Sequence, residues 1–340
     1  MTNHMDRRTF TQALALGLGT AALPVWAQGR RNLHVGHTGI TWPWGQIGGG
    51  GQGRAASPAA PATPPAGRGA ADASLAPAAQ GVRQIDPAAI ETVFREVSEL
   101  GFHGIELFNW QVEAMEAHGG IGPLMQKYRL PLISTYGGPN LTDPAQRQSS
   151  LANVVSTAKL VKKYGGKVMV FGPNGVNRAN FVFADHKANI ITSLNEGAKA
   201  IVDLGLTPVL HQHTGTCVET RDETYAVMEA VDTRYLKFGP DIGQLQKGGA
   251  DPVAVVKDFL PILHHLHLKD FSGGDAFLGY CPLGQGKVNL VAILDMLEGR
   301  TMDGMTMVEL DNSPTMPMTP IETARIARAF LTKQGVPTRA

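Results

Sequence analysis

The chain has 340 residues, of which 43% are hydrophobic and 17% charged, and its formal net charge is +1. This length is enough for one large domain with a well-buried core. The nearly neutral balance argues against a nucleic-acid-binding surface and against a polybasic segment that binds anionic membranes.

The first 27 residues are typical of an export leader rather than of a folded domain. Arg7 and Arg8 precede an apolar run over residues 13–22, and small residues follow up to Ala27. Paired arginines favour a twin-arginine signal over an ordinary secretory signal, and the apolar run is too short for a stable membrane anchor. We therefore expect cleavage after Ala27, the twin-arginine export machinery as a transient partner, and a periplasmic or secreted protein.

Residues 48–82 differ in composition from the rest of the chain. They begin with four glycines and continue as a run of Ala, Pro and Gly with almost no large apolar side chains. Such a segment cannot bury enough surface to offset its conformational entropy. We expect a flexible insertion after the first strand of a single domain that spans residues 30–335.

Short apolar runs alternate with amphipathic stretches along the rest of the chain. The expected strands are 33–36, 104–108, 131–136, 167–171, 207–211, 236–240, 264–268 and 306–310. The expected helices are 88–100, 145–164, 186–204, 223–231, 253–260, 290–297 and 320–332. This alternation predicts a parallel sheet with right-handed crossovers, and its eight strands favour a closed (β/α)8 TIM barrel of the α/β class. No glycine-rich dinucleotide motif follows the first strand, which counts against an open doubly wound sheet.

Polar residues at the carboxyl ends of these strands are the candidates for chemistry, because active sites of such barrels lie there. Alternation places His265, His267 and Lys269 on one face of their strand, and His211 and His213 on one face of theirs. Burying such groups without partners is costly, and a shared divalent cation removes that cost. The further acids at strand ends are Glu106, Asp241 and Glu309. We expect one divalent metal ion, with Mn²⁺, Co²⁺ or Zn²⁺ favoured over Mg²⁺ by mixed imidazole and carboxylate ligands.

Several motifs occur in a characteristic order. They are GFHGIE at 101–106, PDIG at 240–243, HLHLKD at 265–270, PLGQG at 282–286 and VE at 308–309. In these motifs the chain from about residue 84 to 333 resembles the xylose-isomerase-like barrel superfamily of sugar isomerases and epimerases. The segments HQHTGT at 211–216 and CPLG at 281–284 most resemble its inosose dehydratase branch.

The resemblance implies that Asp241, His267 and Glu309 are metal ligands. The family usually has a glutamate at the end of the fifth strand, where this chain has His211. The fourth ligand is therefore open between His211 and, as the less favoured choice, His213.

The resemblance also bears on the type of reaction. In this resemblance, epimerases of the superfamily use two carboxylates, with one glutamate on each face of the substrate exchanging a proton. Of these two glutamates, this chain retains Glu309 alone. Where the family tends to carry a histidine three residues after the strand-six aspartate, this chain has Gln244. These departures weaken a symmetric epimerase and favour a dehydratase or another eliminating lyase.

Three residues are the candidates for catalysis on an enediolate formed next to a metal-bound carbonyl. Glu309 and His213 are the expected proton-transfer groups, and Lys269 is expected to hold a substrate oxygen. The alternative for Lys269 is an ion pair with Asp270 or Glu309.

Further residues are expected to contact the substrate. Trp42 and Trp44 follow the first strand, and their indoles could stack on a sugar ring or pack beneath the insertion. Glu106 is expected to bind a substrate hydroxyl or to order its loop. Gln244 and His265 complete the expected substrate-binding set.

The function expected from these features is that of a metal-dependent sugar or cyclitol isomerase, epimerase or dehydratase. Its substrate would be a small carbohydrate such as a keto-sugar, an inosose or a 3-keto-glycoside. One alternative is a non-catalytic periplasmic barrel that binds sugar or metal. Another, a DNA-repair nuclease of the endonuclease IV kind, is disfavoured by export, neutrality and too few clustered ligands for three metals.

The two cysteines, Cys217 and Cys281, are expected to be small buried residues rather than a disulfide pair. The sequence leaves open the exact substrate, the choice between isomerisation and elimination, the identity of the metal and the oligomeric state.

Overall fold

The computed structural model describes residues 30–43, 46–47, 83–313 and 316–339. The predicted leader (1–27) and insertion (48–82) lie outside these described residues. Within the described part, no helix combines the length and the apolar character that crossing a lipid bilayer requires.

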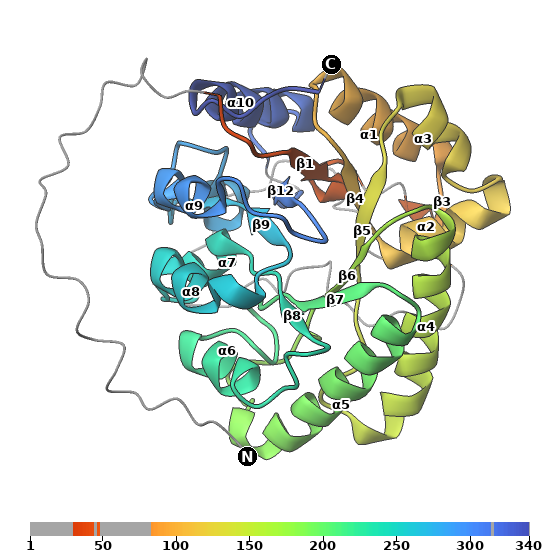
Figure 1. Cartoon of the computed structure of the whole chain (residues 1–340), viewed down its shortest axis with the longest axis vertical. Coiled ribbons are helices and arrows are strands. Elements are labelled where there is room, and N and C mark those ends of the chain that lie inside the picture. The colour runs from red at the N-terminus through yellow and green to blue at the C-terminus, as the bar shows by residue number, and fades with distance from the viewer. Residues whose placement is uncertain (1–29, 44–45, 48–82, 314–315, 340) are drawn as a thin grey trace, which may run out of the picture.

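Eight parallel strands form the centre of the molecule (Figure 1). They are β1 (Val35–Thr38), β4 (Ile105–Phe108), β5 (Leu132–Tyr136), β6 (Val168–Phe171), β7 (Thr207–Leu210), β8 (Lys237–Phe238), β9 (Leu266–Leu268) and β12 (Thr306–Val308). Their order in the sheet is β8-β7-β6-β5-β4-β1-β12-β9. The two end strands are joined by parallel bridges between Phe238 and Leu263 and between Asp241 and His267, which close the ring. The predicted (β/α)8 barrel is confirmed.

The predicted helices surround this barrel (Figure 1). They are α1 (Pro87–Glu99), α4 (Arg147–Lys163), α5 (Phe183–Asp203), α6 (Arg221–Met228), α8 (Pro252–Phe259), α9 (Leu290–Leu297) and α10 (Pro320–Lys333). Local sequence explains where they begin. In α1, Asp86 accepts a hydrogen bond from the N–H of Ala88, with proline at the first helical position. In α10, Thr319 and Glu322 form a capping box.

The sequence prediction missed the connection between β4 and β5. Two short helices lie there, α2 (Asn109–Met115) and α3 (Gly122–Tyr128), and another, α7 (Ile242–Lys247), follows β8. Each has six or seven residues. Two turns of helix are too few to display a 3.6-residue hydrophobic period clearly.

Strand alternation separates two hydrophobic layers. In β6, Met169 and Phe171 belong to the large core between strands and helices. Val168 and Val170 form a small separate cluster with Val209 of β7. Several other inward positions carry polar side chains, among them Glu106, Ser134 and His267, so the interior of the barrel holds many groups that need partners.

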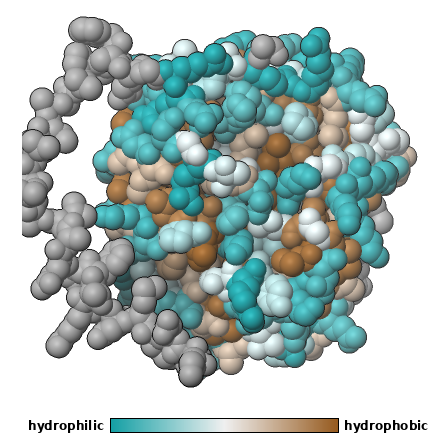
Figure 2. Space-filling model, viewed as in Figure 1, coloured by the Kyte–Doolittle hydropathy of each residue, from teal (hydrophilic) through white to brown (hydrophobic). Residues whose placement is uncertain are grey.

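Two antiparallel strand pairs accompany the barrel. One is a hairpin of β10 (Asp270–Phe271) and β11 (Tyr280–Cys281), and the other pairs β2 (Gln46–Ile47) with β3 (Gln84–Ile85). Cys217 and Cys281 are both buried and free, so the expectation of unpaired cysteines is confirmed. On the face shown in Figure 2, hydrophilic residues predominate and hydrophobic ones form scattered patches among them.

Candidate active site

Strand register brings the candidate residues to the same end of the barrel. Because Met307 pairs with His267 and Val308 with Leu268, the next residues, Lys269 and Glu309, lie side by side beyond the strand ends. His264, on the opposite face, pairs with Asp303 at the surface, with 2.8 Å between Nδ1 and a carboxylate oxygen. The predicted alternation along this strand is therefore confirmed.

Three buried residues offer ligand atoms that all lie within 4.8 Å of one another: His211, Asp241 and His267. Nδ1 of His211 lies 3.2 Å from the carbonyl oxygen of Gly239, so in the neutral imidazole this nitrogen donates and Nε2 carries a lone pair. His211 Nε2 has no hydrogen-bond partner among the described residues. Burial, together with the charge of His267, holds the pKa of His211 well below its usual value, which keeps this imidazole neutral.

Asp241 contributes an oxygen to the same space. Its Oδ1 accepts the N–H of Gln244 at 2.9 Å and caps α7, which directs Oδ2 away from the helix. Oδ2 makes no hydrogen bond that meets geometric criteria among the described residues, although it lies 3.0 Å from Nζ of Lys269. A buried lone pair on His211 and a buried carboxylate oxygen on Asp241 thus converge on His267, and this donor set fits a divalent metal ion.

Glu309 stands beside this group. Its Oε2 lies 2.8 Å from Nδ1 of His267 and its Oε1 accepts from Nζ of Lys269, also at 2.8 Å. Burial raises the pKa of Glu309, but the charges of His267 and Lys269 outweigh burial and hold it well below the usual value. The carboxylate is therefore ionised at neutral pH.

Lys269 is fully buried, and its ammonium contacts three carboxylates. Nζ lies 2.8 Å from Glu309, 2.9 Å from Asp311 and 3.0 Å from Asp241. Burial lowers the pKa of Lys269, but Asp241, Asp311 and Glu309 together raise it well above its usual value. An ammonium has three N–H donors, so the arrangement does not support the predicted contact with a substrate oxygen and matches the ion-pair alternative.

The predicted alternative partner of Lys269, Asp270, has a different task. Its carboxylate accepts backbone N–H groups from Phe271, Gly284, Gly286 and Val288 at 2.9 to 3.2 Å. This pins the PLGQG loop to the β10–β11 hairpin. Asp311 is the buried partner that the sequence interpretation missed. Its spacing of two from Glu309 was a signal that could have revealed it, since alternate residues share a face.

The site holds more negative than positive charge. Four buried carboxylates surround it, those of Glu106, Asp241, Glu309 and Asp311. The positive groups are Lys269, the one buried ammonium in the described part of the chain, and the imidazole of His267, whose pKa the charges of Glu106 and Glu309 raise well above its usual value despite burial. Buried charges need compensation. This excess is a second observation that fits a divalent cation.

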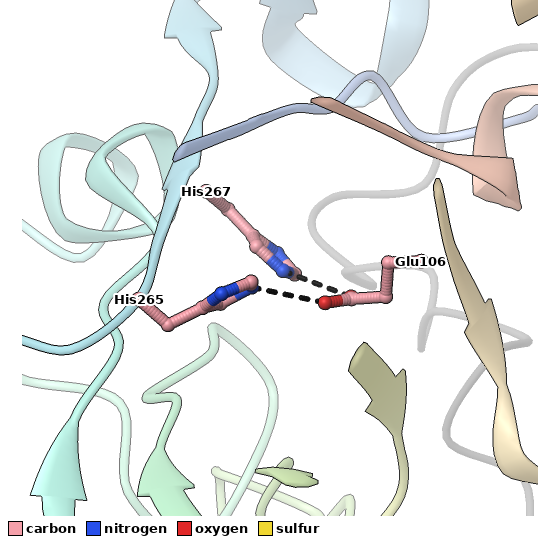
Figure 3. A group of neighbouring side chains, drawn as sticks. All are labelled: Glu106, His265 and His267. Atoms are coloured by element: carbon pink, nitrogen blue, oxygen red, sulfur yellow. Dashed lines mark hydrogen bonds and ion pairs between the residues drawn. The ribbon is translucent and has the colours of Figure 1, made fainter. Parts of the chain in front are cut away.

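A second group lies deeper, where His265 and His267 point from one strand segment toward Glu106 on β4 (Figure 3). Glu106 Oε1 lies 2.9 Å from His267 Nε2, and Oε2 lies 3.0 Å from His265 Nε2. Ser134 Oγ donates to Oε2 at 2.5 Å. Burial raises the pKa of Glu106, but the charge of His267 and the contacts from both histidines hold it well below its usual value.

A pocket opens beside Glu309. It is lined by Thr38, Ile40, Glu106, Leu107, Phe108, Tyr136, His213 and Glu309. Apolar walls with a few acids and hydroxyls suit a small ring that carries hydroxyl groups.

The expected substrate-binding residues are only partly in this pocket. Glu106 lines it, whereas Trp42 is 3% exposed and donates from Nε1 to Glu96 on α1 at 2.6 Å. The edge of the Trp42 ring meets His37, with 5.1 Å between ring centroids. This position corresponds to the packing alternative for Trp42 and not to sugar stacking. Trp44 lies outside the described residues.

Gln244 and His265 also differ from expectation. Gln244 Oε1 accepts from the N–H and the hydroxyl of Thr214, and its Nε2 lies 2.7 Å from Nε2 of His213. Since His213 Nδ1 contacts the carbonyl of Thr214 at 2.7 Å, His213 accepts from the Gln244 amide. Gln244 therefore holds His213, and His265 lies fully buried behind Glu106; neither lines the pocket. The engaged Nε2 of His213 leaves His211 as the better placed fourth ligand.

Comparisons with known proteins agree with this architecture. An inosose dehydratase from Clostridium botulinum (strain Alaska E43 / Type E3) is 22% identical over 271 residues, which cover 72% of this chain and 89% of that protein. The structure of 3-keto-D-glucoside 4-epimerase from E. coli matches with a TM-score of 0.58 and 15% identity, over 72% of this chain and 94% of that one. The IolI protein with a binding zinc atom matches with a TM-score of 0.59 and 16% identity, over 72% and 92%.

The family model described as xylose isomerase-like TIM barrel matches residues 94–334. The match includes every strand from β4 to β12 and every candidate metal ligand. The chain belongs to the xylose isomerase-like TIM barrel family.

Proposed function

We propose that this protein is a metal-dependent enzyme that isomerises, epimerises or dehydrates a small keto-sugar or cyclitol. The observation that carries the proposal is the convergence of His211, Asp241 and His267 next to a pocket lined by Glu309. The names of the similar proteins, an inosose dehydratase and a 3-keto-D-glucoside 4-epimerase, support this class of substrate.

The metal would be held by His211 Nε2, Asp241 Oδ2 and a ring nitrogen of His267, with Glu309 as a further ligand. Two imidazoles and two carboxylates favour Mn²⁺, Co²⁺ or Zn²⁺ over Mg²⁺, and the zinc in the similar IolI structure supports this choice. When bound, the ion polarises a substrate carbonyl and acidifies the hydrogen on the adjacent carbon.

The residues of the chain define how a proton is handled. Glu309 lies at the pocket wall as an ionised carboxylate, and Lys269 fixes its orientation, so it is the candidate base for the hydrogen next to the carbonyl. Glu106 is the other acid on the wall, but three side chains already occupy it. With one carboxylate available, proton removal on one face followed by loss of a hydroxyl as water is favoured over epimerisation.

The test combines metal analysis with product mass. Purified mature protein is assayed for bound metal and then incubated with a panel of inososes, 3-keto-glycosides and ketoses. Products lighter by one water identify dehydration, and new compounds of unchanged mass identify isomerisation or epimerisation. Stoichiometric metal with no turnover on the whole panel would instead indicate a non-catalytic binding barrel.

A pair of variants from neighbouring positions tests the ligand assignment. His267→Ala should lose both metal and turnover, because it removes one of the three side chains that converge at the site, the others being His211 and Asp241. His264→Ala is the matched control, because His264 faces outward to Asp303 and should retain both. Full metal occupancy in His267→Ala would contradict the assignment.

We also propose, from the leader sequence, that the protein acts outside the cytoplasm. Replacing Arg7 and Arg8 by lysine should leave the protein in the cytoplasmic fraction, whereas the unchanged chain should appear in the periplasm or the medium. Export that is insensitive to this change would favour an ordinary secretory signal.

A further inference from the structure

Glu106, His265 and His267 form a second group whose ligand atoms lie within 4.8 Å of one another. By distance alone, this group could also hold a cation. The sequence interpretation assigned Glu106 and His265 to the substrate instead. The hydrogen-bond pattern around His265 distinguishes between these possibilities and a third one.

A backbone hydrogen bond fixes the tautomer of His265. The backbone N–H of Met305 donates to its Nδ1 at 3.2 Å, so Nδ1 carries the lone pair and Nε2 carries the hydrogen. Nε2–H then donates to Glu106 Oε2 at 3.0 Å. A cation on Nε2 would require a hydrogen on Nδ1, where it would face the Met305 N–H. The hydrogen bonds therefore argue against a metal ion between these residues.

The position of this ring is also fixed by close packing. A side-chain carbon at Gly304 would lie 2.4 Å from Nδ1 of His265, so only glycine allows the backbone to approach the ring this closely. His265 is fully buried and does not line the pocket. It has no access to a substrate.

The fixed His265 ring orients the Glu106 carboxylate, which in turn orients the ring of His267. Its Oε2 accepts from His265 and from Ser134, which orients the carboxylate so that Oε1 lies 2.9 Å from Nε2 of His267 (Figure 3). With Nε2 directed at a carboxylate, Nδ1 is the nitrogen on the side of Glu309. A carboxylate behind a metal-bound imidazole fixes the ring and raises the basicity of the ligating nitrogen.

We propose that Ser134, His265 and Glu106 form a positioning relay that selects Nδ1 of His267 as the nitrogen offered to the metal ion. The relay binds neither substrate nor a second ion, and it rests on the proposed metal-dependent function. Its members are positioning residues, because they act through His267.

The test measures metal binding and turnover in the mature protein. The affinity for Co²⁺ is determined by competition with a chelator, and the visible absorption band of the saturated protein reports the ligand field. Glu106→Gln places an amide opposite donors that need a carboxylate. The expected result is a loss of Co²⁺ affinity of roughly 10- to 100-fold with a shifted band. Glu113→Gln is an isosteric change at an exposed residue of α2, where Glu113 accepts from Thr157. It is the matched control and should bind like the unchanged protein.

A second pair of variants tests transmission from His265. His265→Leu removes the donor to Glu106 and should also weaken Co²⁺ binding, whereas His265→Gln retains an N–H donor and should rescue it. The relay predicts one Co²⁺ per chain in the unchanged protein and in every variant at saturation. Thermal unfolding of each apo protein shows whether a variant has folded, and Glu106→Gln carries the test if His265→Leu has not.

The possible outcomes separate the two proposals. Two ions in the unchanged protein and one in His265→Gln would overturn the relay in favour of a second metal site. Unaltered affinity and band in Glu106→Gln, with turnover intact, would also overturn the relay and leave the proposed function standing. Weakened binding in Glu106→Gln, together with no turnover of any substrate by the unchanged metal-loaded protein, would support the relay and contradict the proposed function.

Discussion

Replacing Lys269 by methionine removes the ammonium that contacts three buried carboxylates and offsets part of their charge. All four residues are 5% exposed or less, and the three N–O distances are 2.8 to 3.0 Å. Removing one partner of a buried ion pair typically destabilises a protein by about 3–5 kcal/mol, because the remaining charge stays buried without compensation. Since Lys269 serves three carboxylates, we expect Lys269→Met to lie at the upper end of this range in the metal-free protein.

Urea unfolding of the metal-free protein, followed by circular dichroism, measures this loss. Lys247→Met is the control, because Lys247 donates to the carbonyl of Leu278 at the exposed end of α7 and should contribute less than about 1 kcal/mol. Asp311→Asn removes one of the excess negative charges. The double variant Lys269→Met with Asp311→Asn should therefore recover part of the free energy of unfolding that Lys269→Met loses. If Lys269→Met were no less stable than Lys247→Met, the ammonium would not neutralise this cluster and the charge argument for a cation would fail with it.

Three further predictions concern catalysis, pH dependence and the loop at the site. Glu309→Gln should lower kcat by about 10²- to 10⁴-fold, the range for loss of a general base, and a kcat within a few-fold of the parent would exclude that role. His37 is buried, and burial lowers its pKa to about 4; the unfolded chain therefore binds more protons below about pH 6.5, and stability should fall by about 2 kcal/mol between about pH 7 and pH 5. Urea titrations at both pH values should show that the free energy of unfolding falls less in His37→Gln than in the unchanged protein. An equal fall in the two proteins would show that His37 is not the cause. Asp270→Asn replaces a carboxylate that accepts four N–H groups and should cost about 1–3 kcal/mol by the same assay, while unchanged stability would show that the PLGQG loop is held by other contacts.

Local sequence patterns were sufficient to predict the barrel. Each of the eight strands was expected within three residues of its observed limits, because apolar runs of four or five residues and their capped helices are encoded locally. The same alternation correctly placed His265, His267 and Lys269 on the inner face. The short helices α2 and α3 were missed because they contain too few turns to show a period.

The contacts among the site residues could not be predicted, because they join side chains that are far apart in the sequence. His265 meets Glu106, a residue 159 positions away, across the interior of the barrel. The sequence could indicate that Lys269 faces inward, but not which carboxylates from neighbouring strands surround its ammonium. The sequence left Trp42 open between stacking on a sugar and packing beneath the insertion, and the structure shows a buried indole that donates to Glu96 on α1.

The most direct test of the central claim is anomalous diffraction from crystals of the mature protein grown with Co²⁺ or Zn²⁺. We expect one anomalous peak per chain, about 2.0–2.2 Å from Nε2 of His211, Oδ2 of Asp241 and Nδ1 of His267. A peak between Glu106 and His265, or a crystal saturated with metal that shows no peak at these three atoms, would contradict the account.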